Sequence, residues 1–527
     1  MPVNQTRPKN KVNNLNPHTN HMNGLSFDIS NPLHNLSCAA SSCFFGEPQY
    51  YFPTKDSRKK STKIQVQMHT RGLIEEYLDA ITPSEWYYDN TPAKLLEKAI
   101  DKALDWNPEA TLTEAVRLRN KENIRTTPQV ILVRAANHVK LKGTGLVRKY
   151  GTNIVKRADE LSVCLAYQLQ AYGKPIPNSL KKVLRDGLDR FTDCQLAKYR
   201  MENRTVKTVD VMNMVHPSRT DKIDKLAKGM LKTTGNTWES IRSNGGSWED
   251  AIAVMGHMAL LRNLRNFGKN EVNPDLYLDK LVNTTVGGKQ LPFRYFSAYN
   301  ALKEADFNNP RVLDAVENCL NISISNIPSI KGKTMSLCDN SGSAHGAMTS
   351  SAGTMTMATI GNLTGVITGI MADEGYVGTF GDRLEVTPIR KNSSVFDQLK
   401  TVNKTGRSVG AATENGVWLF WDKAIKTKEH WDNVFIYSDM QAGHGGLYGC
   451  NANEYSNYQW GGRHIHVPKL ISEYRNKVNK NVNVFLVQTA GYQDTIVPEF
   501  YDRTYILGGW GDGILRFAAT MIAANNR

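Results

Sequence analysis

The sequence predicts a protein of two main parts, an array of amphipathic helices followed by a doubly wound α/β sheet domain. Two observations carry this prediction. From about Thr70 to Ile324, apolar residues recur at three- and four-residue spacing, with no competing strand-like alternation. After Pro328, short β-rich runs alternate with helical segments, a pattern typical of a doubly wound sheet. A chain of 527 residues is long enough to bury a core in each part.

Residues 1–35 differ from both parts. They are rich in Asn and Pro and lack periodic apolar positions. Such a segment buries too little apolar surface to offset the entropy cost of ordering. We therefore expect 1–35 to be a disordered arm that precedes the helical part at 36–327.

The helical part consists of amphipathic segments separated by short polar or Pro- and Gly-containing breaks. Short breaks favour antiparallel helix pairs, and the pattern favours a HEAT-like stack, although the sequence has no clean period that fixes the repeat length. Representative segments are RGLIEEYLDAI, AKLLEKAIDKAL, PQVILVRAANHVKL, ADELSVCLAYQLQAY and WEDAIAVMGHMALLRNLRNF.

The α/β part is expected at 328–527. Doubly wound sheets bind their ligands at the carboxyl ends of the strands, so the residues that follow each strand are the candidate site. The alternating runs are TMSLCD, the small-residue helix Met348–Met371, GYVGTFG, LEVTPI, a helix near Val395–Asn403, the helix GVWLFWDKAI, NVFIYSD, PKLISEYRNKV, VNVFLVQTA, TYILGG and GILRFAATMIAA.

The charge of the chain is unevenly distributed. A net charge of +15 favours a polyanionic partner, either nucleic acid or an acidic membrane surface. Residues 1–325 contain 46 Lys and Arg against 33 Asp and Glu, whereas residues 326–527 contain 19 against 17. The excess lies in the helical part, where we expect the polyanion to bind.

Cysteine usage and hydropathy indicate the compartment. The seven cysteines are scattered through apolar segments, without a CxxC pair or a Cys/His cluster at zinc spacing. The sequence contains no apolar run of about 18 residues that would span a bilayer and no apolar signal core near residue 1. We therefore expect a cytoplasmic protein with reduced core cysteines and no membrane partner.

The most specific chemical motif follows the first predicted strand of the α/β part. Asp339, Ser341 and Ser343 form a DxSxS pattern that supplies hard oxygen ligands suited to Mg²⁺. Thr413 precedes the helix GVWLFWDKAI and Asp439 closes the strand NVFIYSD, so both are expected at the same sheet edge. An isolated DxSxS is more often a polar turn in which Ser343 caps the next helix. The added Thr and Asp favour the metal site.

These five side chains resemble the metal-ion-dependent adhesion site of the von Willebrand A family, whose pattern is DxSxS followed by a Thr and a later Asp. The resemblance implies a divalent ion that takes an acidic ligand from a partner. The rival phosphate-loop interpretation of Gly332-Lys333-Thr334 fails, because the tripeptide precedes its strand and Ile327 stands where that loop requires Gly.

Basic clusters interrupted by flat side chains occur between residues 181 and 219. Basic groups make salt-dependent phosphate contacts, and flat side chains stack on unpaired bases. For any one cluster the alternative is a solvated helix face, and for His216 it is a capping or core position. The candidate residues are Lys181, Lys182, Lys198, Arg200, Arg204, His216 and Arg219.

Several segments, taken in order, resemble Ro 60-kDa (TROVE) proteins. The resemblance places Lys198-Tyr199-Arg200 and His216 in the family's Y RNA contact motif. Lys181, Lys182, Arg204 and Arg219 are supporting contacts argued from charge alone. With the A-like domain, these segments cover nearly the whole chain after residue 36: SSCFFGEPQYY, RNKENIRTTPQVILVRAANH, GKPIPNSLKKVLRDGL, LAKYRMENRTVKTVDVMNMVHPSR and MGHMALLRNLRNF.

The resemblance implies a closed, monomeric ring of HEAT-like helices clasped by the A-like domain. Such a ring binds small structured non-coding Y-like RNA on its outer surface and passes single-stranded ends of misfolded RNA through its hole, in RNA quality control. It leaves open whether an exoribonuclease, or another protein that carries an acidic ligand for the metal, docks onto it. The sequence departs from the family at Pro217 after His216 and at Glu414 after Thr413.

Two other function classes remain as alternatives. A metal-dependent adaptor would recruit an acidic protein through the A-like domain, with the helices as a protein-binding solenoid. Chelation would abolish such binding, whereas RNA binding weakens steeply with salt. A metal-dependent nuclease or phosphatase requires a general base or paired carboxylates around two ions, and the sequence offers a single-ion set. We therefore expect a protein that is not an enzyme.

Overall fold

The computed structural model describes residues 92–122, 124–202, 204–232, 237–325, 327–346, 355–411, 415–438, 459–460, 464–465, 467–489, 503–508 and 513–525, with five further positions between 32 and 40. These residues belong to two compact units. The N-terminal unit contains Asp89–Thr237 together with Ser30–Glu47, and the C-terminal unit contains Trp238–Arg527.

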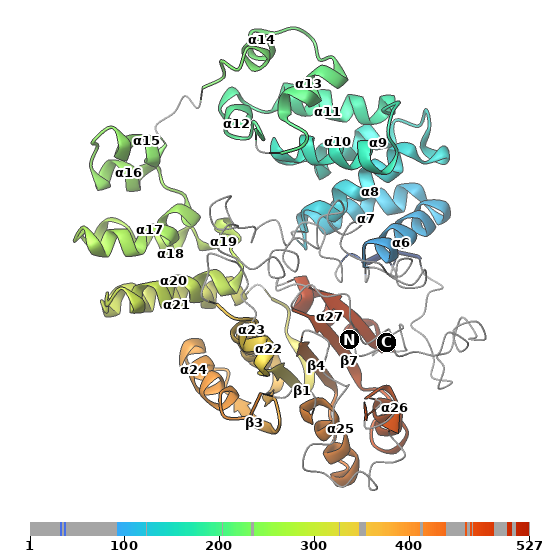
Figure 1. The fold of residues 1–527 in the computed structure, drawn as a ribbon, viewed down its shortest axis with the longest axis vertical. Helices are drawn as coiled ribbons and strands as arrows, with labels where there is room; N and C mark the ends of the chain where they lie inside the picture. Colours follow the sequence, from blue (N-terminus) through green and yellow to red (C-terminus); the bar gives the residue numbers. More distant parts are fainter. Residues whose placement is uncertain are drawn as a thin grey trace. The chain divides into compact units, whose positions relative to one another are not determined.

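The N-terminal unit is a stack of helix pairs (Figure 1). Asn107 and Pro108 separate the first pair, because the Asn107 side chain accepts a 3.0 Å hydrogen bond from the Ala110 N–H while Pro108 occupies the first helical turn. The helices are α6 (Pro92–Trp106), α7 (Pro108–Asn120), α8 (Thr126–Asn137), α9 (Leu146–Ile154), α10 (Asp159–Ala171), α11 (Asn178–Arg190), α12 (Asp193–Lys198), α13 (Thr208–Val215) and α14 (Asp221–Ala227), with the short 3-10 helix η4 (Val139–Leu141).

Contacts between successive helix pairs recur at an interval of 33 residues. Arg134 Nε donates to Asp101 at 2.8 Å, and Arg134 Nη1 donates to the Tyr167 hydroxyl at 2.9 Å, each across 33 positions. His138 Nε2 lies 3.1 Å from Asp105 across the same interval. The sequence left this period open because the equivalent residues Asp101, Arg134 and Tyr167 share no chemistry that a search for repeats would recognise.

The C-terminal unit contains a six-stranded sheet of order β3-β2-β1-β4-β7-β8. Neighbouring strands are parallel except β2 and β3, which pair antiparallel. This topology confirms the predicted fold class, a helical-repeat part followed by a von Willebrand A-like α/β sheet. The strands are β1 (Ile330–Asp339), β2 (Ala372–Phe380), β3 (Leu384–Ile389), β4 (Asn433–Ser438), β7 (Asn483–Gln488) and β8 (Thr504–Gly508), beside a separate two-residue pairing of β5 (Gln459–Trp460) with β6 (His464–Ile465).

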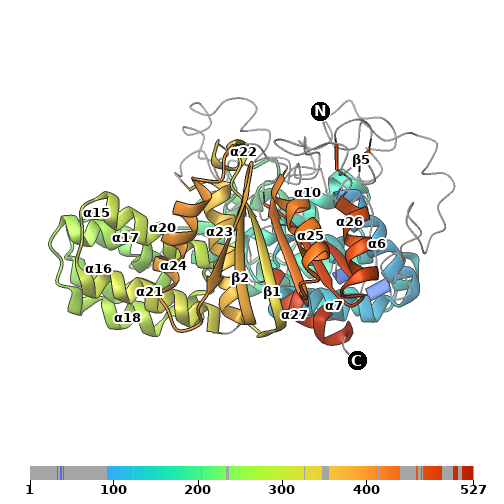
Figure 2. The same ribbon diagram turned by 90° about the horizontal axis from the view of Figure 1, so that it is seen from below.

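Helices cover both faces of the sheet, with α23 and α24 on one side and α25 and α26 on the other (Figure 2). Side chains of β1 alternate between the two layers. Met335 and Leu337 join the buried cluster of Trp418 and Trp421 from α25, whereas Cys338 faces α23. The helices of this domain are α22 (Gly342–Gly346), α23 (Met357–Met371), α24 (Val395–Gly406), α25 (Asn415–Thr427), α26 (Val467–Lys477) and α27 (Gly513–Asn525).

The small residues of α23 have a packing role. A Cβ at Gly365 would lie 2.6 Å from Cys338 Sγ and 3.3 Å from Ser336 Cβ. Because these distances are shorter than van der Waals contact, α23 can pack this closely against β1 only with glycine at position 365. Burial raises the pKa of the Cys338 thiol above its usual range, so the thiol stays protonated at neutral pH. Among the residues that the structure describes, Cys164, Cys194, Cys319 and Cys338 are all free thiols.

The helices that precede the sheet pack against it within the same unit. The rings of Tyr299 and Phe296 pack at a tilt against Phe396 of α24, with centroids 4.4 and 5.6 Å from the Phe396 centroid. The Glu317 carboxylate accepts hydrogen bonds from Ser394 Oγ at 2.6 Å and from the Phe396 N–H at 3.3 Å. These helices are α15 (Trp238–Ser243), α16 (Trp248–Val254), α17 (His257–Lys269), η5 (Pro274–Leu276), α18 (Leu278–Asn283), α19 (Thr285–Gly288), α20 (Pro292–Glu304) and α21 (Pro310–Ser325).

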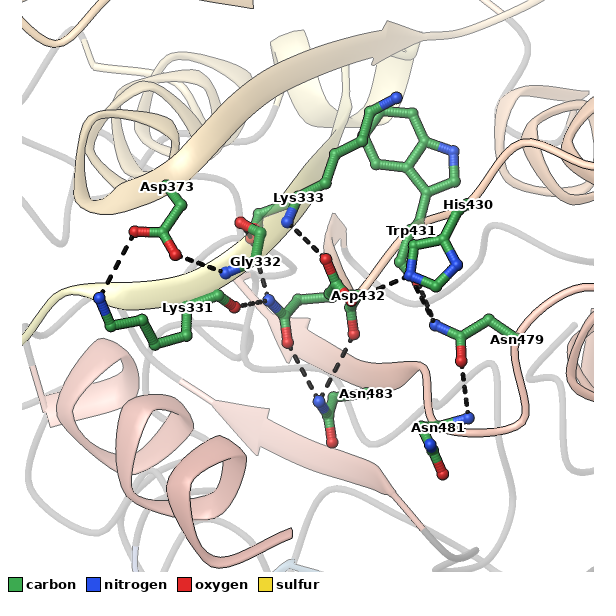
Figure 3. A network of polar contacts seen from close by, with 12 residues as sticks. Lys331, Gly332, Lys333, Asp373, His430, Trp431, Asp432, Asn479, Asn481 and Asn483 are labelled. Carbon is green, nitrogen blue, oxygen red and sulfur yellow. Dashed lines mark hydrogen bonds and ion pairs between the residues drawn. The ribbon is translucent and has the colours of Figure 1, made fainter. Parts of the chain in front are cut away.

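A polar network fixes the amino ends of β1, β4 and β7 (Figure 3). The Asp432 carboxylate accepts a 2.7 Å bond from the Lys333 N–H, and its other oxygen lies 3.0 Å from His430 Nε2. The Asp432 carbonyl accepts the Asn483 N–H at 2.9 Å. Gly332, at φ +96°, forms the irregularity of β1 beside this network. The Gly332-Lys333-Thr334 tripeptide therefore belongs to a structural edge of the sheet, opposite the carboxyl ends.

Candidate nucleic-acid interface and metal centre

The strand order reverses direction between β1 and β4, which is where doubly wound sheets bind ligands. Asp339 closes β1 at this point, with 3% of its surface exposed. One oxygen of its carboxylate accepts the Ser341 N–H at 3.0 Å, and the other accepts the Ser438 hydroxyl at 2.8 Å. The carboxylate therefore spans the turn after β1 and the last residue of β4.

Described residues close in sequence to the remaining predicted metal ligands lie at this edge. Ser438 directly precedes Asp439, and the carbonyl of Ala411, two residues before Thr413, accepts the Gly342 N–H at 2.8 Å. Asp439 and Thr413 themselves fall outside the described residues, as does the side chain of Ser343. The backbone of Ser343 lies in α22, directly after the turn.

Asn340, inside the DxSxS pattern, holds the turn against α23. Its amide exchanges two 2.9 Å hydrogen bonds with the Asn362 amide of α23, and Asn362 donates a further 2.8 Å bond to Asn403 of α24. Asn340 and Asn362 are 1% and 0% exposed, so these amides must satisfy each other. The sequence reasoning missed this support, although an Asn between two ligand positions was visible in it.

The donor set fits a hard divalent cation. A buried carboxylate is costly without a compensating positive charge, and the turn after β1 places the buried Asp339 carboxylate two residues before the fully buried Ser341, whose hydroxyl accepts the Ala344 N–H at 3.4 Å. Among the described residues, no group of three His, Cys, Asp or Glu side chains is placed to hold a metal ion.

The predicted RNA residues lie around the two ends of α13. At its start, the Thr208 hydroxyl donates to the Tyr199 carbonyl at 2.6 Å, and the Thr208 N–H donates to the Arg200 carbonyl at 3.1 Å. Arg157 Nη2 donates to the Tyr199 hydroxyl at 2.8 Å, which fixes this ring. Lys198 is exposed and Arg200 half-buried on either side of the anchored Tyr199.

His216 caps the other end of α13, about 12 Å along the helix from Thr208 by the usual rise per residue. The residue is exposed, and its backbone adopts the left-handed conformation, at φ +50°, directly before Pro217. A non-glycine residue rarely adopts this conformation. Arg185 of α11 donates to the carbonyl of Val215, so the turn of α11 that carries Lys181 and Lys182 approaches the same helix end.

The seven residues therefore form two groups, one at each end of α13. His216 does occupy a capping position, the alternative considered for it, and its exposed ring remains accessible. The predicted cations make no ion pair with any carboxylate in the described part of the chain, in contrast to Arg148, Arg157 and Lys225 of the same unit. They are Lys181, Lys182, Lys198, Arg200, Arg204 and Arg219.

A second basic surface, on α17, was not among the residues predicted from the sequence. Arg262, Arg265 and Lys269 are exposed at helical spacing, and no ion pair engages them in the described residues. The helix contains no acidic residue. The sequence signal for this surface is the spacing of Arg262, Arg265 and Lys269, which lie three and four residues apart and therefore share one helix face.

The described residues include no helix long and apolar enough to cross a bilayer. No protein-family model matches the sequence, and no curated protein matches it. Among solved structures, the chain is similar to the Ro (RSR) protein of Deinococcus radiodurans, with a TM-score of 0.55 and 13% sequence identity. The match covers 84% of this chain and 95% of that one. The chain therefore has the fold of a Ro protein, as its sequence motifs predicted.

Proposed function

We propose that this protein is a non-catalytic ribonucleoprotein component that binds a small structured, Y-like RNA on the surface around α13. The observation that carries the proposal is the set of unpaired cations at both ends of that helix, together with the exposed His216. Cations without carboxylate partners are free to neutralise phosphates. The Ro-type fold supports the same assignment.

The proposal extends to RNA quality control in the cytoplasm. In a ring of the kind that the family resemblance implies, single-stranded ends of misfolded RNA would pass through the hole while the structured RNA occupies the outer surface. An exoribonuclease would then act on the threaded end. The excess of basic residues in 1–325 supports a polyanion as the substrate of this part.

We further propose a Mg²⁺ site at Asp339, Ser341, Ser343, Thr413 and Asp439. A bound ion would supply a Lewis acid that takes a carboxylate from a partner. The buried Asp339 carboxylate, which accepts the Ser341 N–H and the Ser438 hydroxyl, supports this site. The alternative function, a metal-dependent protein adaptor, depends on the same residues and requires no RNA.

The decisive experiment recovers the tagged protein from its own cells and sequences the RNA bound to it. The wild-type protein is compared with the Lys198→Ala/Arg200→Ala/His216→Ala variant. Recovery of a small stem-loop RNA by the wild type alone supports the proposal. If no RNA rises above background, and an acidic protein is recovered in an EDTA-sensitive manner, the adaptor function replaces it.

A further inference from the structure

Three large apolar side chains are exposed at equivalent positions of three successive helix pairs in the N-terminal unit. Trp106 ends α6, Val139 opens η4 after α8, and Tyr172 follows α10, with exposed fractions of 54%, 70% and 39%. Consecutive members are 33 residues apart, the interval that relates the contacts of successive pairs. We call Trp106, Val139 and Tyr172 the apolar row.

Polar contacts link the helix ends that carry the apolar row. His138 lies 3.1 Å from Asp105, and each of these residues directly precedes a member of the row. Lys140 Nζ also donates to the Asp105 carbonyl. The Arg134 guanidinium of α8 lies 5.7 Å from the ring centroid of Tyr172. The three members lie at the ends of α6, α8 and α10, which succeed one another in the stack of helix pairs (Figure 1).

The regularity of the apolar row distinguishes it from ordinary surface. Single exposed apolar residues are common and require no explanation. Here the same position of three successive helix pairs exposes one, and helices pack about 8–10 Å apart. Repeat proteins bind extended ligands through such arrays, with one subsite for each repeat. The ligand that fits the apolar row is accordingly elongated.

The charges beside the apolar row indicate the chemistry of that ligand. The carboxylates of Asp101 and Asp105 are already engaged by Arg134 and His138. Four exposed lysines lie within four residues of a member of the apolar row in the sequence, and none makes an ion pair with a carboxylate within the described ranges, although Lys140 donates to the Asp105 carbonyl. These lysines are Lys102, Lys140, Lys142 and Lys174.

We propose that the apolar row binds an unpaired strand of RNA, with bases stacked on Trp106 and Tyr172 and phosphates beside Lys142 and Lys174. Stacking on aromatic rings accepts every base, so binding is independent of sequence. An acidic peptide would use the lysines without needing two flat rings in register. The inference rests on the proposed RNA-binding function, but its residues are separate from those around α13.

The test measures binding of a labelled oligouridylate of about ten nucleotides, long enough to cross three helix pairs, to the full-length protein. Trp106→Ala/Tyr172→Ala should weaken this binding by roughly tenfold, because each stacked base contributes substantially to affinity. The matched variant Trp106→Phe/Tyr172→Phe keeps both rings and should bind within about twofold of the wild type. A labelled stem-loop RNA serves as the second probe.

Each outcome bears on a separate claim. The inference is overturned if the double alanine variant binds the oligouridylate as tightly as the wild type, or if the alanine and phenylalanine variants lose affinity equally. It is also overturned if the wild type binds a poly-glutamate probe more tightly than the oligouridylate. If the wild type binds the stem-loop but not the oligouridylate, the apolar row is not an RNA site, and only the proposed stem-loop binding around α13 stands. If it binds neither RNA, the proposed function fails as well. Thermal unfolding checks that every variant folds.

Discussion

The Ser438 hydroxyl donates a 2.8 Å hydrogen bond to Asp339 Oδ2 across the reversal of strand order between β1 and β4. This bond joins the two strand ends that carry the proposed metal ligands. It also orients the carboxylate, because the other oxygen is held by the Ser341 N–H. The proposed metal and RNA surfaces involve different residues, and each can therefore be tested alone.

Asp339→Ala should abolish saturable Mg²⁺ binding, measured by calorimetry, because it removes the charged ligand. Asp339→Asn keeps the shape and should lose the same signal. Asp373→Asn is the matched control, since Asp373 accepts the Gly332 N–H at the opposite edge of the sheet. RNA affinity should stay unchanged in all three. Loss of RNA binding by folded Asp339→Asn would show that the two surfaces are not separate.

Lys198→Ala/Arg200→Ala/His216→Ala should weaken stem-loop RNA binding and flatten its salt dependence. The slope of log affinity against log salt should fall by roughly 2, because two phosphate-neutralising cations are lost. Fluorescence titrations at several salt concentrations measure this slope. Lys400→Ala/Lys423→Ala removes two exposed lysines of the sheet domain and should leave it unchanged. An unaltered slope in the triple variant contradicts the assignment.

Asn362→Ala should destabilise the C-terminal unit by about 1–3 kcal/mol, because the buried Asn340 amide then lacks its partner. Thr364→Ala on the same helix loses only a bond to the Ile360 carbonyl and should cost less. Urea denaturation compares the two. Equal costs would mean that the network contributes little beyond helix packing.

His257→Gln should reduce the sensitivity of the unfolding temperature to acid. Burial lowers the pKa of His257, and a hydrogen bond to the Leu281 carbonyl opposes this only in part. The unfolded chain therefore binds a proton that the folded chain refuses, and stability falls as pH drops below about 6.5, by at most about 1.4 kcal/mol per pH unit. Calorimetric scans at neutral and mildly acidic pH test this. An identical acid response in both proteins would rule out His257 as its source.

The sheet and the position of Asp339 were predictable because apolar strands ending in polar residues leave a direct trace in the sequence. The order of the strands, and the antiparallel pairing of β3 with β2, are not determined by the α/β alternation. The 33-residue period was not predictable, since Trp106, Val139 and Tyr172 share only their apolar character. The left-handed backbone of His216 was also hidden, because a residue before proline is normally extended.

The packing of Phe396 against Tyr299 and Phe296 determines what can be exchanged between proteins as one piece. A recombination event that joined foreign sequence at residue 328 would transplant a sheet whose α24 lacks its aromatic cover and the Glu317 contact. A junction near Trp238 preserves both. The sheet and the helices that precede it from Trp238 onward therefore form one structural unit. An experiment that grafts this domain onto another protein should begin the insert near Trp238.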